Sequence, residues 1–144
     1  SPIRVGVLVQ YWLIKTEPST WSWNDQVTKK TTSWDGVRNY QAANNLKAMN
    51  VGDLCFFYHS VSDRQIIGIV EVIRPYHPDP SDPTGRFGMV DVKAVKALKI
   101  PVHLDDIKVE PRLAHLALVR QSRLSVMPID KDAWDLILEM GEEE

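Results

Sequence analysis

The chain has 144 residues and a mass of 16.4 kDa, which is the size of one ordinary domain. Hydrophobic residues make up 44% and charged residues 25%, so the composition excludes a disordered chain and a fibrous repeat. No apolar run approaches the ~18–20 residues of a membrane-spanning helix, and residues 3–9 lack the cleavage pattern of a secretory signal. The single cysteine, Cys55, excludes an internal disulfide and a multi-cysteine zinc site.

Charge is unevenly distributed along the chain, although the formal net charge is only −2. Residues 86–123 carry eight basic and four acidic side chains, whereas residues 124–144 carry one basic and seven acidic ones. A solvated mixed surface and a groove for a polyanion are both compatible with this pattern.

The first part of the chain predicts one strand and two helices. Residues 1–10 are rich in valine and fit either an edge strand or an extension outside the domain. A strand is expected over Tyr11–Thr16, where aromatic and β-branched residues end at a Glu-Pro pair. Helices are expected over Ser22–Lys30 and over Asn39–Met49, whose apolar residues fall on one stripe.

The middle of the chain is dominated by strand patterns. Leu54–Tyr58 is apolar on both faces, and Ile66–Ile73 contains Gly68, which indicates a bulge or a close approach of another group to the backbone. Val90–Ile100 alternates as a half-buried strand does. Four prolines within residues 75–83 exclude a helix and a central strand, so we expect an exposed, stiff loop there.

The last third predicts short helices and one strand. Helical turns are expected over Leu104–Glu110 and Arg112–Leu116, and a short strand over Leu124–Met127. Asp130 caps a final helix that runs to Met140, with Gly141 just beyond its end. Short strands with flanking helices and no regular βαβ alternation predict an α+β fold built on a small, strongly curved sheet or barrel.

Five tryptophans are many for this length, and their sequence settings differ. Trp12 and Trp134 lie in a predicted strand and helix and are expected in the core. Trp21, Trp23 and Trp34 lie in a polar stretch where periodicity assigns them no core position. Such tryptophans either hold a loop in place or bind a ligand, and Trp34 is the best binding candidate.

Trp34 is followed by a glycine turn that leads into the second predicted helix. The start of a helix presents unpaired N–H groups and a partial positive charge, which suits an anion. Arg38 adds a bidentate donor beside it. An aromatic plane next to an anion site suits one nucleotide, with its base on the ring and its phosphate at the helix end.

A second polar group, Tyr58, His59 and Ser60, falls at the end of a predicted strand. Alternation places Tyr58 and Ser60 on one face and His59 on the other. Hydroxyl and imidazole groups both donate and accept hydrogen bonds, so they can contact base edges. A histidine satisfied structurally at the sheet end is the alternative interpretation.

Catalytic and metal motifs are missing from the sequence. The four histidines lack metal-ligand spacing, and neither a phosphate loop nor a GxSxG elbow is present, so no metal or cofactor is predicted. Cys55 in an apolar strand indicates a buried, inert thiol. Lys15, Thr16 and Glu71 could activate a nucleophile or water, but adjacent strand residues point to opposite faces.

Several segments resemble the EVE domain family, whose eukaryotic members are the thymocyte nuclear protein group, in order and spacing over residues 11–140. The segments are Tyr11–Pro18, Trp34–Ala42, Phe57–Ser60, Gly68–Val72 and Arg123–Val126. The resemblance implies a PUA-like pseudo-barrel of five to six strands with peripheral short helices, related to YTH and ASCH domains. Residues 1–10 then form an extension and residues 141–144 an acidic tail.

The resemblance implies a non-catalytic module that reads a modified nucleobase, such as a modified cytosine, in DNA or RNA. It implies no cofactor, no membrane partner, a monomer, and a bacterial cytoplasmic location, or a nuclear one if the chain is eukaryotic. Matching positions imply a ligand site drawn from Lys15, Glu17, Trp21, Trp34, Arg38, Asn39, Tyr40, Gln41, Tyr58, His59 and Ser60. Trp23 would help Trp21 to wall the opening.

One departure from the family pattern affects the expected affinity. The family usually shows Tyr-Gln-Ala-Arg-Asn, whereas this chain has Ala43 in place of the arginine. The loss of this basic contact lowers the expected affinity. Because the chain is also near-neutral overall, we expect weak, salt-sensitive nucleic-acid binding or a preference for single strands. The alternative functions are a small ASCH-like amidohydrolase acting on a modified nucleoside through Lys15, Thr16 and Glu71, and a protein-interaction module that uses the aromatic surface.

Overall fold

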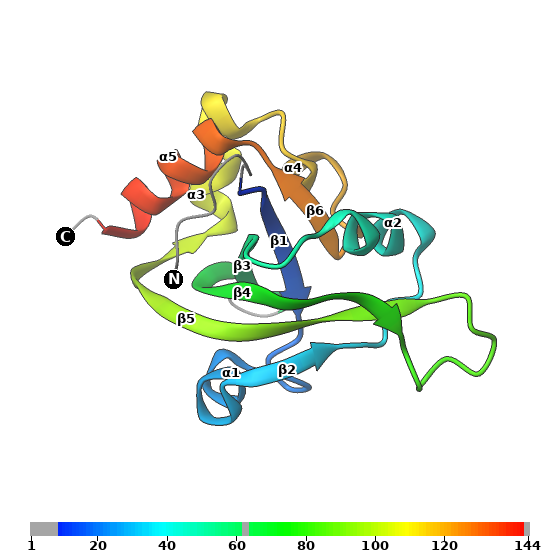
Figure 1. Cartoon of the computed structure of the whole chain (residues 1–144). Coiled ribbons are helices and arrows are strands. Elements are labelled where there is room, and N and C mark those ends of the chain that lie inside the picture. The colour runs from blue at the N-terminus through cyan, green and yellow to red at the C-terminus, as the bar shows by residue number, and fades with distance from the viewer. Residues whose placement is uncertain (1–8, 62–63, 143–144) are drawn as a thin grey trace.

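The computed structural model describes residues 9–61 and 64–142. They form a six-stranded sheet in the order β2-β5-β4-β3-β1-β6, shown in Figure 1. The sheet is open, because β2 and β6 are separate edges. The strands are β1 (Tyr11–Thr16), β2 (Thr31–Trp34), β3 (Leu54–His59), β4 (Gln65–Pro78), β5 (Gly88–His103) and β6 (Val126–Ile129).

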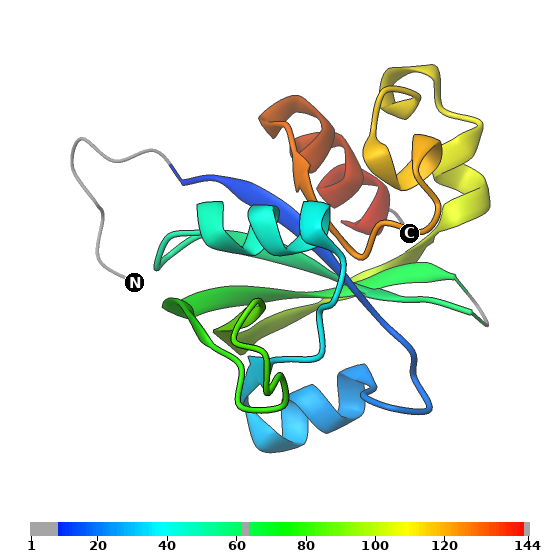
Figure 2. The same ribbon diagram turned by 90° about the vertical axis from the view of Figure 1, so that its right-hand side faces the viewer.

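The helices are short and lie on the outside of the curved sheet. Helix α1 lies with β2 on one side of the long β4–β5 pair, and the other helices lie on the opposite side (Figures 1 and 2). This arrangement confirms the predicted α+β fold with a mixed, curved sheet. The helices are α1 (Trp23–Lys29), α2 (Tyr40–Ala48), α3 (Leu104–Lys108), a 3₁₀ turn (Pro111–Leu113), α4 (Ala117–Arg120) and α5 (Lys131–Glu142).

Strands β1 and β3 are parallel, and the other pairings among the described strands are antiparallel. A parallel pair needs a long crossover connection, and here that connection carries α1, β2 and α2. The register pairs Lys15 with Tyr58 and Thr16 with His59, so the carboxyl ends of both strands lie side by side. The predicted polar residues of both strands therefore lie close together at this end of the β1–β3 pair.

One part of the core lies between α5 and the β1–β3 pair. The ring of Trp134 stacks on Phe56 at 3.8 Å and on Tyr11 at 4.6 Å between centroids. Trp12 is also buried, and its Nε1 donates to Asp53 at 3.0 Å. The predicted core positions of Trp12 and Trp134 are confirmed.

Phe57 occupies a second part of the core, between two tryptophans. Its ring centroid lies 5.1 Å from that of Trp23 and 5.6 Å from that of Trp34, both edge-on. The two indoles are 6% and 8% exposed, so the prediction that they have no core position is wrong. Gly68 is confirmed as a close approach, because a Cβ there would lie 2.6 Å from ring atoms of Trp23.

Two proline-containing segments extend strands further than the sequence predicts. Strand β4 continues through Pro75 to Pro78, which pairs with Gly88 on β5, so the loop begins later than expected. The pairing with β3 ends at Glu71, so the prolines lie where β4 has one free side. Pro128 likewise lies within β6, which is an edge strand.

Other element boundaries also differ from the predictions. Strand β2 was not predicted, and the turn expected over Arg112–Leu116 is a 3₁₀ turn that ends at Leu113. Helix α5 continues through Gly141 to Glu142, where a Cβ on the glycine would lie 3.1 Å from Leu98. The question of an edge strand within residues 1–10 falls mostly outside the described residues.

Candidate functional site

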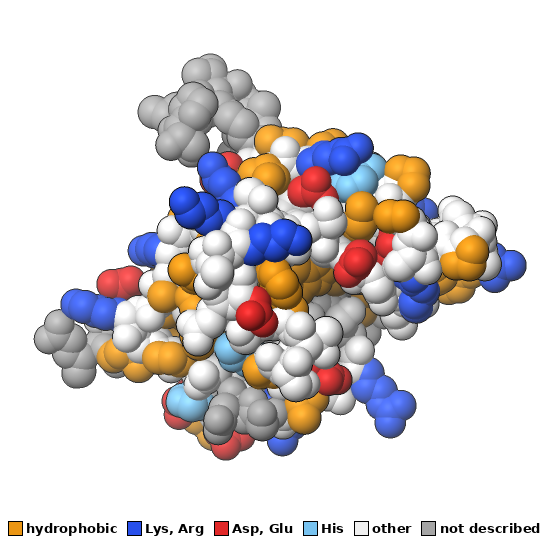
Figure 3. All heavy atoms as spheres, turned by 90° about the horizontal axis from the view of Figure 1, so that it is seen from below, with side chains coloured by type: hydrophobic (Ala, Val, Ile, Leu, Met, Phe, Trp, Pro, Cys, Tyr) orange, Lys and Arg blue, Asp and Glu red, His pale blue; other side chains and the backbone are white. Residues whose placement is uncertain are grey.

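A pocket of about 360 Å³ opens at the carboxyl end of β1, beside α1 and β2. We call it the tryptophan pocket, and all of its lining residues fall within residues 15–35. They are Lys15, Thr16, Thr20, Trp21, Lys29, Thr32, Ser33, Trp34 and Asp35. Its volume is within the range of small-molecule sites. On the side of α1 and β2, basic and acidic side chains are interspersed, with hydrophobic side chains recessed between them (Figure 3).

Both indoles of the pocket are held by contacts behind them. Trp21 is partly exposed, and its Nε1 donates to Oε1 of the buried Gln26 at 3.0 Å. The Thr16 hydroxyl donates to the Trp21 carbonyl at 2.9 Å, which fixes this residue to the end of β1. Trp34 is held edge-on against Phe57. The aromatic lining is therefore preorganised.

Two lysines supply positive charge to the pocket. Lys29 Nζ lies 5.8 Å from the Trp21 ring centroid. Lys15 Nζ donates to the Ser122 carbonyl at 3.0 Å and lies 5.6 Å from the Tyr58 ring centroid. Burial lowers the pKa of Lys15. With the nearby hydroxyls and the Asp35 carboxylate, the pocket offers cations, donors and acceptors around two aromatic rings.

Tyr58 and Ser60 face a different hollow from the tryptophan pocket. This second hollow measures about 460 Å³ and shares Lys15 with the first. His59 is instead used structurally, because its Nε2 accepts the Trp23 backbone N–H at 3.0 Å. Burial lowers the pKa of His59, which favours the neutral ring that this bond requires.

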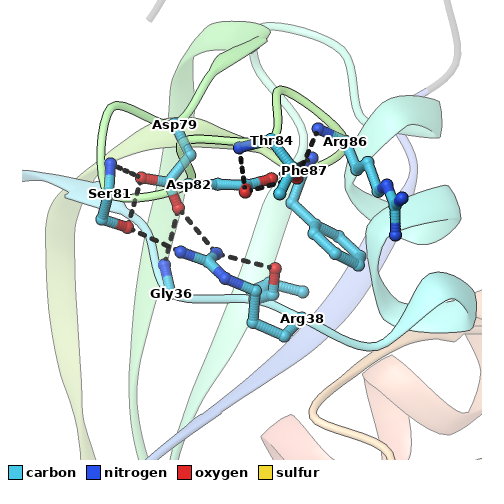
Figure 4. A network of polar contacts seen from close by, with 9 residues as sticks. Gly36, Arg38, Asp79, Ser81, Asp82, Thr84, Arg86 and Phe87 are labelled. Atoms are coloured by element: carbon cyan, nitrogen blue, oxygen red, sulfur yellow. Dashed lines mark hydrogen bonds and ion pairs between the residues drawn. The ribbon is translucent and has the colours of Figure 1, made fainter.

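The predicted group at the start of α2 does not join the tryptophan pocket. Arg38 Nη1 lies 3.1 Å from Asp79 Oδ2, and its Nη2 donates to the Ser81 hydroxyl at 2.9 Å (Figure 4). Asn39 Oδ1 accepts the Ala42 N–H at 2.9 Å and caps the helix. These hydrogen bonds occupy the groups that the sequence analysis predicted to bind a phosphate. The structure brings Trp34 together with Lys15 and Trp21 instead.

The remaining predicted residues have other surroundings. Tyr40 is 62% exposed, and its ring lies 5.0 Å from that of Phe87. Gln41 lines a third hollow together with Asn39. Glu17 is exposed, and its backbone carbonyl accepts the N–H groups of Thr20 and Trp21 at 2.9 Å. Its role is thus to form the turn that positions Trp21.

Asp79 is the centre of the network that holds Arg38. Burial on its own would raise the pKa of Asp79, but hydrogen bonds from Ser81, the Gly36 N–H and Arg38 outweigh it and hold the pKa at about 2. The contacts of Asp79 with Gly36 and Arg38 cross from the loop between β4 and β5 (residues 79–87), which we call the proline-rich loop, to the chain just after β2 (Figure 4). Arg38 therefore fastens this loop.

Several pocket residues were not singled out from the sequence. Thr32 and Ser33 line the pocket because they precede Trp34 on the short edge strand β2. The sequence analysis did not recognise this strand. Lys29 comes from the last turn of α1, and Thr20 and Asp35 from the flanking turns. These positions depend on tertiary packing and carry no sequence pattern of their own.

The residues of the possible hydrolytic site do not converge. The register places Glu71 in the row of Leu54 and Tyr11, four positions before Lys15 on β1. Four strand positions correspond to ~13 Å. Cys55 is fully buried, and burial raises the pKa of its thiol, as expected of an inert group. No cluster of potential metal ligands is present among the described residues.

Within residues 9–61 and 64–142, no helix is long and apolar enough to span a membrane.

Comparison with known proteins identifies relatives over nearly the whole chain. Residues 10–140 match the EVE domain family. Thymocyte nuclear protein 1 of Rattus norvegicus is 34% identical over 171 aligned positions, which cover 95% of this chain and 76% of the relative.

Solved structures agree with this relationship. A Rhodopseudomonas palustris protein solved by NMR is 50% identical with a TM-score of 0.88, covering 92% of this chain and 93% of that one. The human THYN1 protein, solved in complex with 5-methylcytosine-containing DNA, is 31% identical with a TM-score of 0.90, covering 94% and 99%. A YTH domain of Zygosaccharomyces rouxii, 17% identical with a TM-score of 0.58, shares the fold. The predicted PUA-like fold is confirmed.

Proposed function

Since the chain belongs to the EVE domain family, we propose that it is a non-catalytic nucleic-acid-binding module that holds a modified nucleobase in the tryptophan pocket. The observation that carries the proposal is the convergence of two indoles and two lysines in one pocket at the end of β1. The human relative solved with 5-methylcytosine-containing DNA supports the class of ligand. A modified cytosine is accordingly the first candidate base.

The chemistry of the pocket matches that of a nucleobase. A flat ring stacks on indoles with a gain of ~1–3 kcal/mol per base. The Thr20 hydroxyl can donate to or accept from base edges. The Asp35 carboxylate and the Thr16 hydroxyl, whose proton is donated to Trp21, can accept. Lys15 and Lys29 supply the charge that attracts the phosphate of the same nucleotide.

The energy balance favours unpaired bases as ligands. A base in a duplex must leave the stack at a cost of a few kcal/mol, which is about what stacking on indoles returns. Phosphate contacts must supply the rest, and the chain as a whole carries a net charge of −2. We therefore propose weak, salt-sensitive binding with a preference for single strands. The monomeric state and the cellular compartment stay predictions.

The test is a binding screen by fluorescence anisotropy. The oligonucleotides are single-stranded and carry one 5-methylcytosine, one 5-hydroxymethylcytosine, one N6-methyladenine or no modification. We expect one modified base to bind more tightly than its unmodified counterpart. Trp21→Ala should abolish this preference, and this variant is chosen because Trp21 is less buried than Trp34.

Tyr40→Ala is the matched control, because Tyr40 is an exposed aromatic residue outside the pocket. It should leave affinity and preference unchanged. Circular dichroism checks that both variants fold. Equal affinity for all four oligonucleotides would overturn the proposal, and so would conversion of the modified base detected by mass spectrometry, since a reader releases its ligand intact.

A further inference from the structure

Three hollows adjoin one another near the carboxyl ends of β1 and β3. The tryptophan pocket shares Lys15 with the second hollow, and the second shares Ser122 with a third of about 330 Å³. The two shared residues are joined by the 3.0 Å hydrogen bond from Lys15 Nζ to the Ser122 carbonyl. The hollows therefore follow one another in a row, with the tryptophan pocket at one end.

The second and third hollows are lined by cations. Arg64 lines the second, and Arg120 and Arg123 line the third. All three are exposed, and none forms an ion pair with a carboxylate of the described residues. We call these three residues the arginine track. Arg120 and Arg123 belong to the basic segment that the sequence marked as a possible polyanion groove.

Two other arginines of the chain are paired with carboxylates. Arg38 is paired with Asp79, and Arg112 is paired with Glu110 at 2.7 Å. No acidic side chain of the described residues lines the second or the third hollow. The positive charge of the arginine track is thus available to a ligand, and a guanidinium is well suited to bidentate contact with a phosphate.

We propose that the arginine track binds successive phosphates of a single polynucleotide strand whose modified base occupies the tryptophan pocket. The proposal rests on the proposed function and adds the path of the strand. The strand passes from the tryptophan pocket over Lys15 into the second hollow and past Ser122 into the third. The ligand is accordingly an oligonucleotide, and a free nucleoside or mononucleotide fills only the first hollow.

The test compares single variants of the track with a matched control. Arg64→Ala, Arg120→Ala and Arg123→Ala each remove one exposed cation, and so does Arg74→Ala on β4. Arg74 lines none of the three hollows, and it lies nine positions beyond Gln65 on that strand, or ~30 Å along it. Affinities are measured for single-stranded oligonucleotides of increasing length, modified and unmodified, over a series of salt concentrations.

We expect each track variant to weaken binding of long oligonucleotides several-fold more than Arg74→Ala does. The slope of log K against log salt should fall by about 0.7 for each lost phosphate contact. The ratio of modified to unmodified affinity should stay unchanged, because the track does not touch the base. A mononucleotide should bind all variants equally, and DNA and RNA strands should respond alike.

The outcomes separate the two proposals. If the track variants match Arg74→Ala in affinity and slope while the wild type still prefers a modified base, the track is wrong and the proposed function stands. If the wild type shows no preference but the variants still lower affinity and slope, the base-reading function fails. The phosphate contacts of the arginine track then hold, but the statement that a modified base occupies the tryptophan pocket is overturned. Equal losses for a mononucleotide, or losses confined to duplex DNA, would also overturn the track.

Discussion

The indole of Trp23 lies so close to Gly68 that a Cβ on the glycine would come within 2.7 Å of three ring carbons. Trp23 is the first residue of α1, and its ring also packs on Phe57. Helix α1 therefore packs on the sheet through the Trp23 ring, which can come this close only because residue 68 is a glycine. The same helix supplies Lys29 to the tryptophan pocket.

Gly68→Ala should destabilise the fold and disturb the pocket. Forcing a methyl group into this contact displaces the indole, and overpacking of this kind costs about 1–3 kcal/mol. Urea denaturation measures the loss. In a Trp23→Leu background the ring is gone, so the cost of Gly68→Ala should shrink. If the losses in the free energy of unfolding from the two substitutions were fully additive, the contact between Gly68 and Trp23 would not be the cause of the destabilisation.

The bond between His59 and Trp23 should make stability depend on pH. Burial lowers the folded-state pKa of His59 below its ordinary value of 6.5, so the unfolded chain binds the proton first. The contribution to the free energy of unfolding is therefore complete above pH 6.5. It decreases as the pH falls from there to the folded-state pKa.

His59→Gln provides the comparison, because a glutamine carbonyl can still accept the Trp23 N–H but does not titrate. Denaturation at a series of pH values should show wild type losing stability relative to this variant below pH 6.5. The other three histidines are present in both proteins, so they do not contribute to the difference. A difference that does not change with pH would contradict the assignment.

Asp79→Asn should loosen the proline-rich loop. The substitution removes the charge paired with Arg38 and weakens acceptance from Ser81 and Gly36, at an expected cost of about 1–3 kcal/mol. Glu139→Gln, at an exposed position of α5, is the control and should change stability little. Thermal denaturation at neutral pH measures both.

The hydrogen bonds of Asp79 also predict how stability changes at acidic pH. Because the Asp79 pKa is held at about 2 in the fold against 3.8 ordinarily, its stabilising contribution is present above pH 3.8 and is lost as the pH falls towards 2. Acid denaturation of wild type and Asp79→Asn should therefore converge at low pH. A constant gap between them would mean that the charge is not what stabilises the loop.

Cys55 should be unreactive in the folded protein. Its side chain is fully buried, and burial, followed by the charge of Asp53, raises the pKa of the thiol. Labelling by a thiol reagent should be slow in buffer and should accelerate with denaturant in step with unfolding. Fast labelling without denaturant would show that β3 opens locally.

The fold was predicted best where many apolar residues repeat along one element. Tyr11–Thr16 has the same bounds in the sequence prediction and in the structure, and β3 and β5 were identified from their patterns. Strand β2 has four residues and a single buried one, which is too little for a periodic signal. Trp34 was consequently missed as a core residue. Trp23 was missed for another reason, because its contact with Phe57 depends on how α1 packs on the sheet.

The lining of the candidate pocket was anticipated only in part. Lys15 and Trp21 were taken from the resemblance to the EVE family and Trp34 from its own motif, and the structure places all three on one pocket. Arg38 was also chosen from its motif, but its partners Asp79 and Ser81 come 41 and 43 residues later in the chain. A local motif shows which donor is present. It does not show which distant carboxylate will occupy that donor once the chain is folded.

The tryptophan pocket is built from one uninterrupted stretch of chain, residues 15–35, most of which lies in the crossover between β1 and β3. Under the proposed function, the chemistry of the pocket can therefore change by exchange within a short piece of sequence while the remaining strands keep their pairing. A chimera that carries this stretch from a relative is expected to take on the base preference of that relative.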